Sequence, residues 1–425
     1  MNATTDRKFK SLRRIITATL TSLFLAAAFT SCDDLRSILD PQEPAPVSTL
    51  KIGVIQPPQF YSSFARGAEI ARMEINAAGG VLGMPVEFVI RDNQGTDIFP
   101  TPESTIYAAH DLVENENVVA ILGPIFSTNS VALGAKLTEA GIDIPILPGA
   151  TSASVPHSYS HFVLAGANNL HQANVLANFA LTELGTRSVG IALMAGDEYT
   201  RVTTEGFISD FEAGGGEIVS VATYEVGTTD FGPQIKVLMA GDPEAIFLPS
   251  FPPEVPNFIE QAIAMGYTGQ FLGADGWDDV AGFYSVLDDN TLMDGSYYIA
   301  NFFPGSGDPV ANAFADAFMA AYNVLSDSSG AAGYDSMRLL AHAIEMAAGE
   351  MGGMDGETMT PDADAILAAL LDVQNYQGAT MISHFDENRL AVKDYNILTI
   401  QDGMPAFYKA WDSSGGMGDG ADQGE

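Results

Sequence analysis

The chain has very few cysteines and few basic residues for its 425 residues. Cys32 is the only cysteine, and 18 Lys plus Arg stand against 54 Asp plus Glu. A single cysteine forms no disulfide within the chain, so the fold has to depend on a hydrophobic core. The formal net charge of −36 argues against nucleic acid and anionic lipid as partners, because both carry the same sign of charge.

Motifs for several kinds of chemistry are also missing. The sequence contains no Gly-Lys pair, no His-Glu-x-x-His, no Cys-x-x-Cys and no Gly-x-Ser-x-Gly. The six histidines show no metal-ligand spacing. They are His110, His157, His161, His171, His342 and His384. We therefore expect no metal, no cofactor and no catalysis; a hydrolase would need an unrecognised pair of acids.

The N-terminus carries the pattern of an export signal. Five basic residues precede an apolar run over residues 15–29, which is too short to span a bilayer comfortably. The run ends at Phe-Thr-Ser-Cys, so Cys32 stands where a bacterial lipoprotein is cut and acylated. We predict a signal peptide over residues 1–31 and a lipidated Cys32 that anchors a periplasmic or cell-surface protein to a membrane. Ordinary secretion, with Cys32 lost or idle, is the alternative.

The rest of the chain divides by composition. Residues 32–48 contain three prolines and predict a tether, while the Gly- and Asp-rich residues 412–425 predict a disordered tail. Between them, apolar runs such as Val-Val-Ala-Ile-Leu alternate twice with helical patterns, which is typical of parallel strands covered on both faces. We predict an α/β fold of two doubly wound parallel-sheet lobes with a hinge between them.

The predicted elements follow this rhythm. Strands are expected over residues 50–55, 86–91, 118–122, 144–147, 188–193, 217–223, 245–248, 270–273 and 396–400. Helices are expected to begin near Phe64, Thr101, Ser127, Asn168, Tyr199, Phe231, Pro253 and Pro361, and to cover residues 309–325 and 333–351. Tyr334, Asp335 and Ser336 then open a helix, which gives Asp335 a capping or bracing role near the hinge.

Three segments carry a family resemblance. Residues 67–95 read GAEIARMEINAAGGVLGMPVEFVIRDNQG, and the loops GPIFS (123–127) and PGATS (148–152) follow two short strands. In this order and spacing, the chain resembles the periplasmic solute-binding proteins of branched-chain amino acid ABC transporters. The resemblance implies a type I periplasmic binding fold that captures a small amino acid or related carboxylate by hinge closure and delivers it to the importer's permease. It also implies a three-stranded hinge, with lobe 1 over residues 49–166 and 302–388 and lobe 2 over residues 167–301 and 389–411. A ligand-responsive regulator of an envelope complex is the alternative.

One wall of the expected site presents neutral donors. Ser127 follows a strand and starts a helical stretch, where its hydroxyl and the free amides could hold a carboxylate; it could also cap its own helix. Gly149, Ala150 and Thr151 form a tight turn after the next strand. The resemblance implies that these positions bind the α-carboxylate of an amino acid, whereas a plain loop is the alternative.

The facing wall presents an acid. Asp275 follows a strand of the second series, and the resemblance implies that it binds the α-ammonium; a turn aspartate is the alternative. Tyr199 matches an aromatic residue that lines the family's site. Further aromatic residues could form an apolar side-chain pocket or could be core packing. They are Phe60, Tyr61, Phe126, Phe251 and Trp277. The side-chain preference of the ligand stays open.

Overall fold

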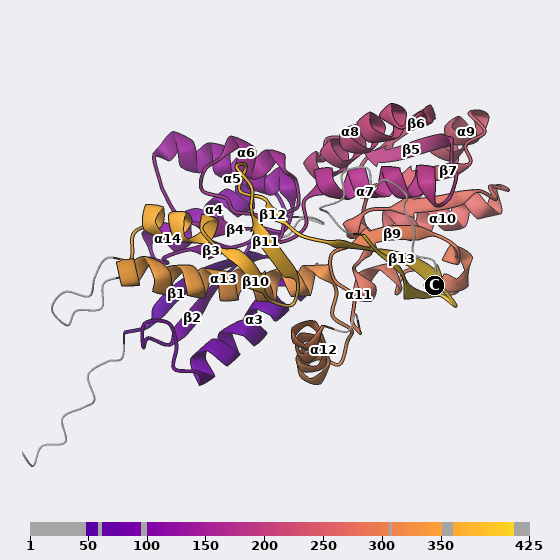
Figure 1. Ribbon diagram of the computed structural model, residues 1–425. Coiled ribbons are helices and arrows are strands. Elements are labelled where there is room, and N and C mark those ends of the chain that lie inside the picture. The colour runs from indigo at the N-terminus through magenta and orange to yellow at the C-terminus, as the bar shows by residue number, and fades with distance from the viewer. Residues whose placement is uncertain (1–47, 58–61, 95–99, 306–307, 351–359, 412–425) are drawn as a thin grey trace, which may run out of the picture. The chain divides into compact units, whose positions relative to one another are not determined.

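The computed structural model describes residues 48–57, 62–94, 100–305, 308–350 and 360–411 (Figure 1). The predicted signal peptide, Cys32, nearly all of the tether, the tail, Phe60 and Tyr61 lie outside these residues. The chain forms two units, residues 1–48 and 49–425, and the second unit contains the strands and helices described below.

The first sheet consists of four parallel strands. These are β1 (Leu50–Gln56), β2 (Val86–Asp92), β3 (Ile121–Leu122) and β4 (Ile146–Leu147), in the order β2-β1-β3-β4. β1 is almost entirely buried, as its continuous apolar sequence predicts. β3 is shorter than predicted, but Val119 still donates to the Lys51 carbonyl at 3.0 Å, so the preceding residues also run along β1.

The second sheet repeats this order and then extends it. Its strands are β5 (Ser188–Met194), β6 (Glu217–Tyr224), β7 (Ala245–Leu248), β8 (Gln270–Gly273), β9 (Tyr297–Ala300), β13 (Tyr395–Gln401) and β14 (Met404–Trp411). The order β6-β5-β7-β8 matches that of the first sheet, and β9, antiparallel β13 and β14 continue it. The sequence prediction missed β9 and β14. β14 is an exposed edge strand without the buried apolar run that marked the others.

Helices follow the strands as predicted. The first series has α3 (Ser62–Ala77), α4 (Pro102–Glu114), α5 (Ser127–Ala140) and the short α6 (Ser154–Ser158). The second has α7 (Asn169–Thr182), α8 (Glu198–Ala213), α9 (Gly232–Ala240), α10 (Glu254–Ala264), η1 (Asp275–Trp277), α11 (Val280–Phe283) and η2 (Asn290–Met293). Then come α12 (Pro309–Tyr322), α13 (Ser328–Glu350) and α14 (Ala363–Leu371). Side chains cap several of them, including Asn168 on α7 and Asp197 on α8.

Glycines let α13 pack closely along α3 (Figure 1). A Cβ at Gly67 would lie 1.8 Å from the Gly330 carbonyl oxygen, and a Cβ at Gly333 would lie 1.8 Å from the Phe64 carbonyl oxygen. Any larger residue would force the helices apart. This contact explains the glycine that opens the 67–95 segment and the glycine before Tyr334.

The start of α13 differs from the prediction. The helix begins at Ser328, not at residue 333, so Tyr334, Asp335 and Ser336 lie inside it. The reason is Asp327, whose carboxylate accepts the Gly330 amide at 2.8 Å and so stabilises an earlier first turn. Asp335 braces the helix: it accepts the Ala379 and Thr380 amides at 2.7 and 2.9 Å.

We call each sheet, with the helices that cover it, a lobe; the residue boundaries of the lobes stay a prediction. The chain passes between the sheets after β4, after β9 and before β13. Leu164 of the first passage pairs with Leu390 of the last in a parallel bridge. A small antiparallel sheet lies beside it, made of β10 (Gln374–Gln377), β11 (Met381–Phe385) and β12 (Ala391–Val392). The predicted fold class is confirmed, with an antiparallel addition to the second sheet.

Candidate functional site

A cavity lies beyond the carboxyl ends of strands from both sheets, where ligands of doubly wound folds bind. The space that no atom fills is about 740 Å³, part of it open to solvent. Seven of the residues predicted from sequence line it. They are Phe126, Ser127, Gly149, Thr151, Tyr199, Phe251 and Asp275.

The loops after β3 and β4 meet on one side of this cavity. Ser127 is almost fully buried, and its hydroxyl oxygen accepts the Ser152 amide at 3.3 Å. The cap residue of α5 is Phe126, with no side-chain hydrogen bond, so Ser127 does not cap its own helix. A Cβ at Gly149 would lie 2.8 Å from the Ile125 side chain, so the loops approach this closely only with glycine there. The N-terminus of α5, with its partial positive charge, therefore opens onto the cavity.

The facing side contains Asp275 at the end of β8. The Tyr199 hydroxyl donates to Asp275 Oδ1 at 2.8 Å, and the Asp275 amide donates to Gln172 Oε1 at 3.0 Å. Burial raises the pKa of Asp275, while the hydrogen bonds from Tyr199 and Gln172 act in the opposite direction. Neutral side chains, those of Tyr199 and Gln172, hold this partly buried acid in place. An acid in such surroundings can bind a cationic group.

Three aromatic rings border the cavity. Phe126 of the first lobe meets Phe251 of the second edge to face, with ring centroids 5.7 Å apart. Tyr199 lies against Phe251 at 4.9 Å. These rings give the site an apolar surface between the two polar walls.

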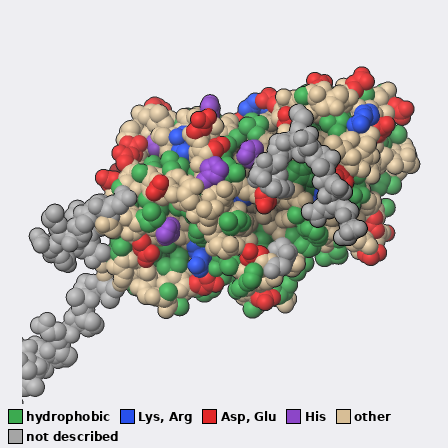
Figure 2. Space-filling model, in the orientation of Figure 1, with side chains coloured by type: hydrophobic (Ala, Val, Ile, Leu, Met, Phe, Trp, Pro, Cys, Tyr) green, Lys and Arg blue, Asp and Glu red, His purple; other side chains and the backbone are tan. Residues whose placement is uncertain are grey.

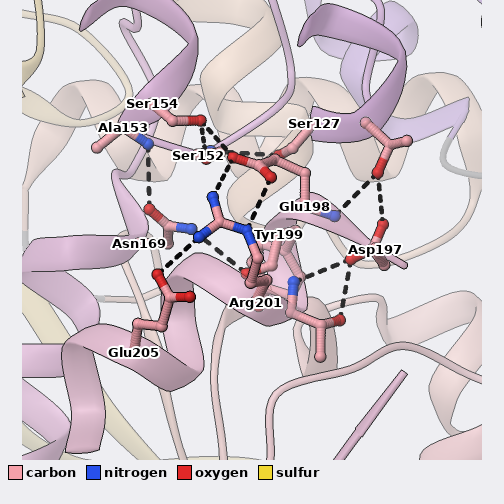
Figure 3. A network of polar contacts seen from close by, with 12 residues as sticks. Ser127, Ser152, Ala153, Ser154, Asn169, Asp197, Glu198, Tyr199, Arg201 and Glu205 are labelled. Carbon is pink, nitrogen blue, oxygen red and sulfur yellow. Dashed lines mark hydrogen bonds and ion pairs between the residues drawn. The ribbon is translucent and has the colours of Figure 1, made fainter. Parts of the chain in front are cut away.

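Polar contacts join the lobes next to these rings (Figure 3). The Ser154 hydroxyl donates to Glu198 Oε1 at 2.6 Å, and Thr128 Oγ1 donates to Asp197 Oδ2 at 3.0 Å. Arg201 binds Glu198 from the other side, at 2.8 Å. The N-terminus of α8 is thereby attached to α5 and α6.

Two of the predicted residues that the structure describes do not line the cavity. Ala150 is buried but does not line it, and Tyr61 lies outside the described residues. Trp277 is fully buried in the core, where its Nε1 donates to the Leu248 carbonyl at 2.9 Å. Its ring occupies the space above Gly273, since a Cβ there would lie 2.1 Å from the ring. Trp277 is therefore a core residue, which was the alternative to a role in the pocket.

Other lining residues were missed. The polar ones are Ser63, Asp278, Asp279, Asn301, Asp327, Ser328 and Ser329. Two signals were present in the sequence: Asp278 and Asp279 directly follow Asp-Gly-Trp, and Ser-Asp-Ser-Ser at residues 326–329 is a helix-start pattern. Neither signal indicated a shared cavity, because some fifty residues separate the two segments.

Two of the missed acids meet at the N-terminus of α13. Asp278 Oδ2 accepts the Ser328 amide at 2.7 Å, and Asp327 Oδ2 accepts the Ser63 hydroxyl at 2.7 Å. Burial and the neighbouring Asp327 charge raise the pKa of Asp278 well above its usual range. Burial, and then the charge of Asp279, raise the pKa of Asp327 to about 7. A proton or a bound cation relieves this repulsion.

We expect Asp327→Asn to change how stability depends on pH. A pKa of about 7 in the folded state exceeds the unfolded value of about 3.9, so folding takes up a proton between these values. Raising the pH from 4 to 7 therefore lowers the free energy of unfolding, by an amount on the order of a few kcal/mol. Asparagine retains the cap and removes this dependence.

Urea unfolding of both proteins at pH 4 to 7, without ligand, measures the effect. The stability advantage of the native protein over the variant should shrink as pH rises. Asp362→Asn, which changes an exposed cap on α14, is the control for losing one such charge. A difference between native and variant that stays constant with pH contradicts the prediction.

The described residues offer no other obvious chemistry. Among them, no group of three or more His, Cys, Asp and Glu side chains is placed to hold a metal ion. In the same residues, no helix combines the length and apolar character needed to cross a membrane. Acidic side chains are scattered in small groups over the face in Figure 2, with few Lys and Arg between them.

Residues 49–404 match the periplasmic binding protein family, and the chain belongs to this family. A structure of the leucine-binding protein LivK from Thermotoga maritima is similar, with 26% identity, a TM-score of 0.75 and coverage of 86% of this chain and 99% of that chain. LivJ from Streptococcus pneumoniae in complex with isoleucine has 25% identity, a TM-score of 0.74 and the same coverage. The predicted resemblance to branched-chain amino acid binding proteins is confirmed.

The sequence relatives match over a shorter stretch. An amino acid binding protein of Pseudomonas aeruginosa is 25% identical over 51% of this chain and 56% of that protein. The chain thus spans about half the length of this relative. These similar proteins are solute-binding proteins.

Proposed function

We propose that this protein captures a small amino acid, or a related carboxylate, between its two lobes and delivers it to an ABC importer. The observation that carries the proposal is the pairing of Ser127 and Thr151 with Asp275 around one cavity. A carboxylate at the α5 N-terminus and an ammonium at Asp275 would each meet the complementary charge or dipole. The leucine and isoleucine in the names of similar proteins support an amino acid as ligand.

The assignment divides the residues of the site by role. Ser127, Gly149 and Thr151 bind the carboxylate, Asp275 with Tyr199 binds the ammonium, and Phe251 with Phe126 contacts the side chain. Ala150 positions the loop between Gly149 and Thr151. The protein performs no catalysis in this scheme. Lipid on Cys32 would hold the receptor near the importer's permease, which is its protein partner.

Calorimetric titration of the purified full-length chain with the standard amino acids tests the proposal. A thermal-shift screen identifies candidates first, because a ligand at 100 times its Kd stabilises by about 2.7 kcal/mol. We expect at least one amino acid to bind at a stoichiometry of one. If none binds and small carboxylates are also inactive, the proposal is wrong and a regulatory role becomes the better hypothesis.

We expect Thr128→Val to weaken binding about three- to tenfold, since a hydrogen bond contributes about 0.5–1.5 kcal/mol. Thr128 Oγ1 donates to Asp197 and accepts the Glu198 amide at 3.0 Å, so valine removes two contacts between the lobes. Closure around the ligand should then cost more.

Thr182→Val is the matched control, because Thr182 is exposed and, among the described residues, its Oγ1 bonds only within α7, to the Asn178 carbonyl at 2.7 Å. Calorimetry should show native affinity for this control. Equal affinities of both variants and the native chain would mean that the contacts between the lobes do not support binding.

A further inference from the structure

The cavity contains more acid than a ligand with one ammonium would use. Four aspartates line it, and none of the described lining residues is Lys, Arg or His. Asp275 alone is enough for an α-ammonium. The three others, Asp278, Asp279 and Asp327, are called the α13 carboxylates here, because they gather around the start of that helix.

Backbone amides hold the α13 carboxylates in place. Asp278 accepts the Ser328 amide at 2.7 Å, Asp327 accepts the Gly330 amide at 2.8 Å, and Asp279 accepts the Gly282 amide at 2.9 Å. Serine, threonine or asparagine would serve a helix N-terminus as well as aspartate does. Capping therefore does not account for three carboxyl groups around one cavity.

Two of these acids are deeply buried without a basic partner. Asp278 is 6% exposed and Asp327 is 3% exposed. Neither forms an ion pair with Lys, Arg or His in the part of the chain that the structure describes. The charge of Arg66 lowers the pKa of Asp327, but this effect is weaker than those of burial, of Asp279 and of the hydrogen bonds from Gly330 and Ser63. Burying like charges together is unfavourable unless a proton or a cation compensates them.

An unpaired amide lies in the same place. The Asn301 backbone amide donates to Ser328 Oγ at 3.1 Å, which fixes this residue beside the start of α13. Its side chain lines the cavity and the residue is 6% exposed, yet neither Nδ2 nor Oδ1 has a partner among the described residues. A buried amide that faces a cavity is expected to bond to whatever fills that cavity.

We propose that the ligand carries a second cationic group, an ammonium or a guanidinium on its side chain, which the α13 carboxylates and Asn301 bind. The inference rests on the proposed function, because the carboxylate and α-ammonium of the same ligand occupy the α5 N-terminus and Asp275. The ligand class is then a basic amino acid.

An organic cation fits better than a metal ion. No three acidic or histidine side chains of the described residues are placed to hold a metal. An ammonium or guanidinium has several N–H donors and can bind carboxylates that do not converge on one point. Binding should also release protons near pH 7, because a nearby cation favours the ionised form of Asp327, whose pKa is about 7.

Two pairs of amino acids with closely similar shape test the proposal by calorimetry on the full chain. Lysine is compared with norleucine, and arginine with citrulline. We expect one cationic member to bind at least tenfold more tightly than its neutral counterpart. If norleucine or leucine binds as tightly as lysine and arginine, this inference fails while the proposed function stands. If no amino acid of either charge binds, this inference fails, and the proposed function fails as well when small carboxylates are also inactive. Binding of calcium chloride, titrated separately, in place of any amino acid would indicate a metal site and overturn the inference.

Asp279→Asn then tests whether the preference for a cationic amino acid depends on the α13 carboxylates. Asparagine retains the cap on α11, so the change removes mainly a charge. Affinity for the preferred basic amino acid should fall at least fivefold, with little change for its neutral counterpart. Asp289→Asn is the matched control, because the exposed Asp289 caps η2 outside the cavity. The assignment of the second cationic group to this wall is wrong if Asp279→Asn loses the same affinity for the basic and the neutral amino acid. It is also wrong if Asp289→Asn loses as much affinity as Asp279→Asn.

Discussion

Asp275→Asn should lower the affinity for the tightest-binding amino acid by about 30-fold or more. Removing one partner of a buried charge pair costs about 2–5 kcal/mol, and each 1.4 kcal/mol is a factor of about ten. The Asp275 carboxylate accepts the Tyr199 hydroxyl at 2.8 Å and lines the cavity, where a ligand ammonium can approach it. Asparagine preserves the shape but presents an amide with half the acceptors and no charge.

The loss should appear in binding and not in folding. Burial already disfavours the charged form of Asp275, so the ligand-free variant should be at least as stable as the native chain in thermal unfolding. Tyr199→Phe, which removes the hydroxyl that orients the acid, should cause a smaller loss. Calorimetry that finds native affinity in Asp275→Asn would remove this residue from the site, whereas native affinity in Asp289→Asn is the expected control result.

Asp335→Asn should reduce the free energy of unfolding by about 3–5 kcal/mol, the usual cost of breaking a buried charge pair. Asp335 accepts three hydrogen bonds, from the Ala379 and Thr380 amides and from Thr380 Oγ1 at 2.6 Å. Thr380 Oγ1 accepts in turn from Lys393 Nζ at 2.9 Å. Without the carboxylate, a buried lysine loses its counterion and an amide group faces backbone donors.

Urea unfolding followed by circular dichroism measures this effect. Combining Asp335→Asn with Lys393→Met removes both charges, so the double variant should be more stable than the sum of the two single losses predicts. Burial lowers the pKa of Lys393 to about 8, and the Asp335 charge opposes that change. If the single variant loses less than about 1 kcal/mol, the pair is not a stabilising element of the passages between the lobes.

Much of the fold could be predicted because its signals are local. Continuous apolar runs marked β1, β5, β7 and β8 to within about one residue. Capping residues such as Thr101 and Asn168 placed the helix starts. The exposed strand β14 was not predicted, because an edge strand that pairs mainly through its backbone needs no buried apolar run.

The candidate site was predictable where loops directly follow strands. Parallel strands end at one edge of a sheet, so Ser127, Thr151 and Asp275 could be expected around a common cavity. The orientation of a side chain was not: Trp277 lies two residues after Asp275 but turns into the core. Whether a residue in such a turn faces the cavity or the core depends on the direction of its Cα–Cβ bond, which the local sequence does not specify.

The sequence by itself determined the order of strands and helices and their caps, because each depends on residues near one another in the chain. Only the tertiary structure decided that Asp278, Asn301 and Asp327 share one wall, and that Lys393 lies buried near Asp335. These groups come from segments tens of residues apart. Their burial and mutual charge arise when the passages between the lobes bring those segments together, and local patterns contain no trace of that contact.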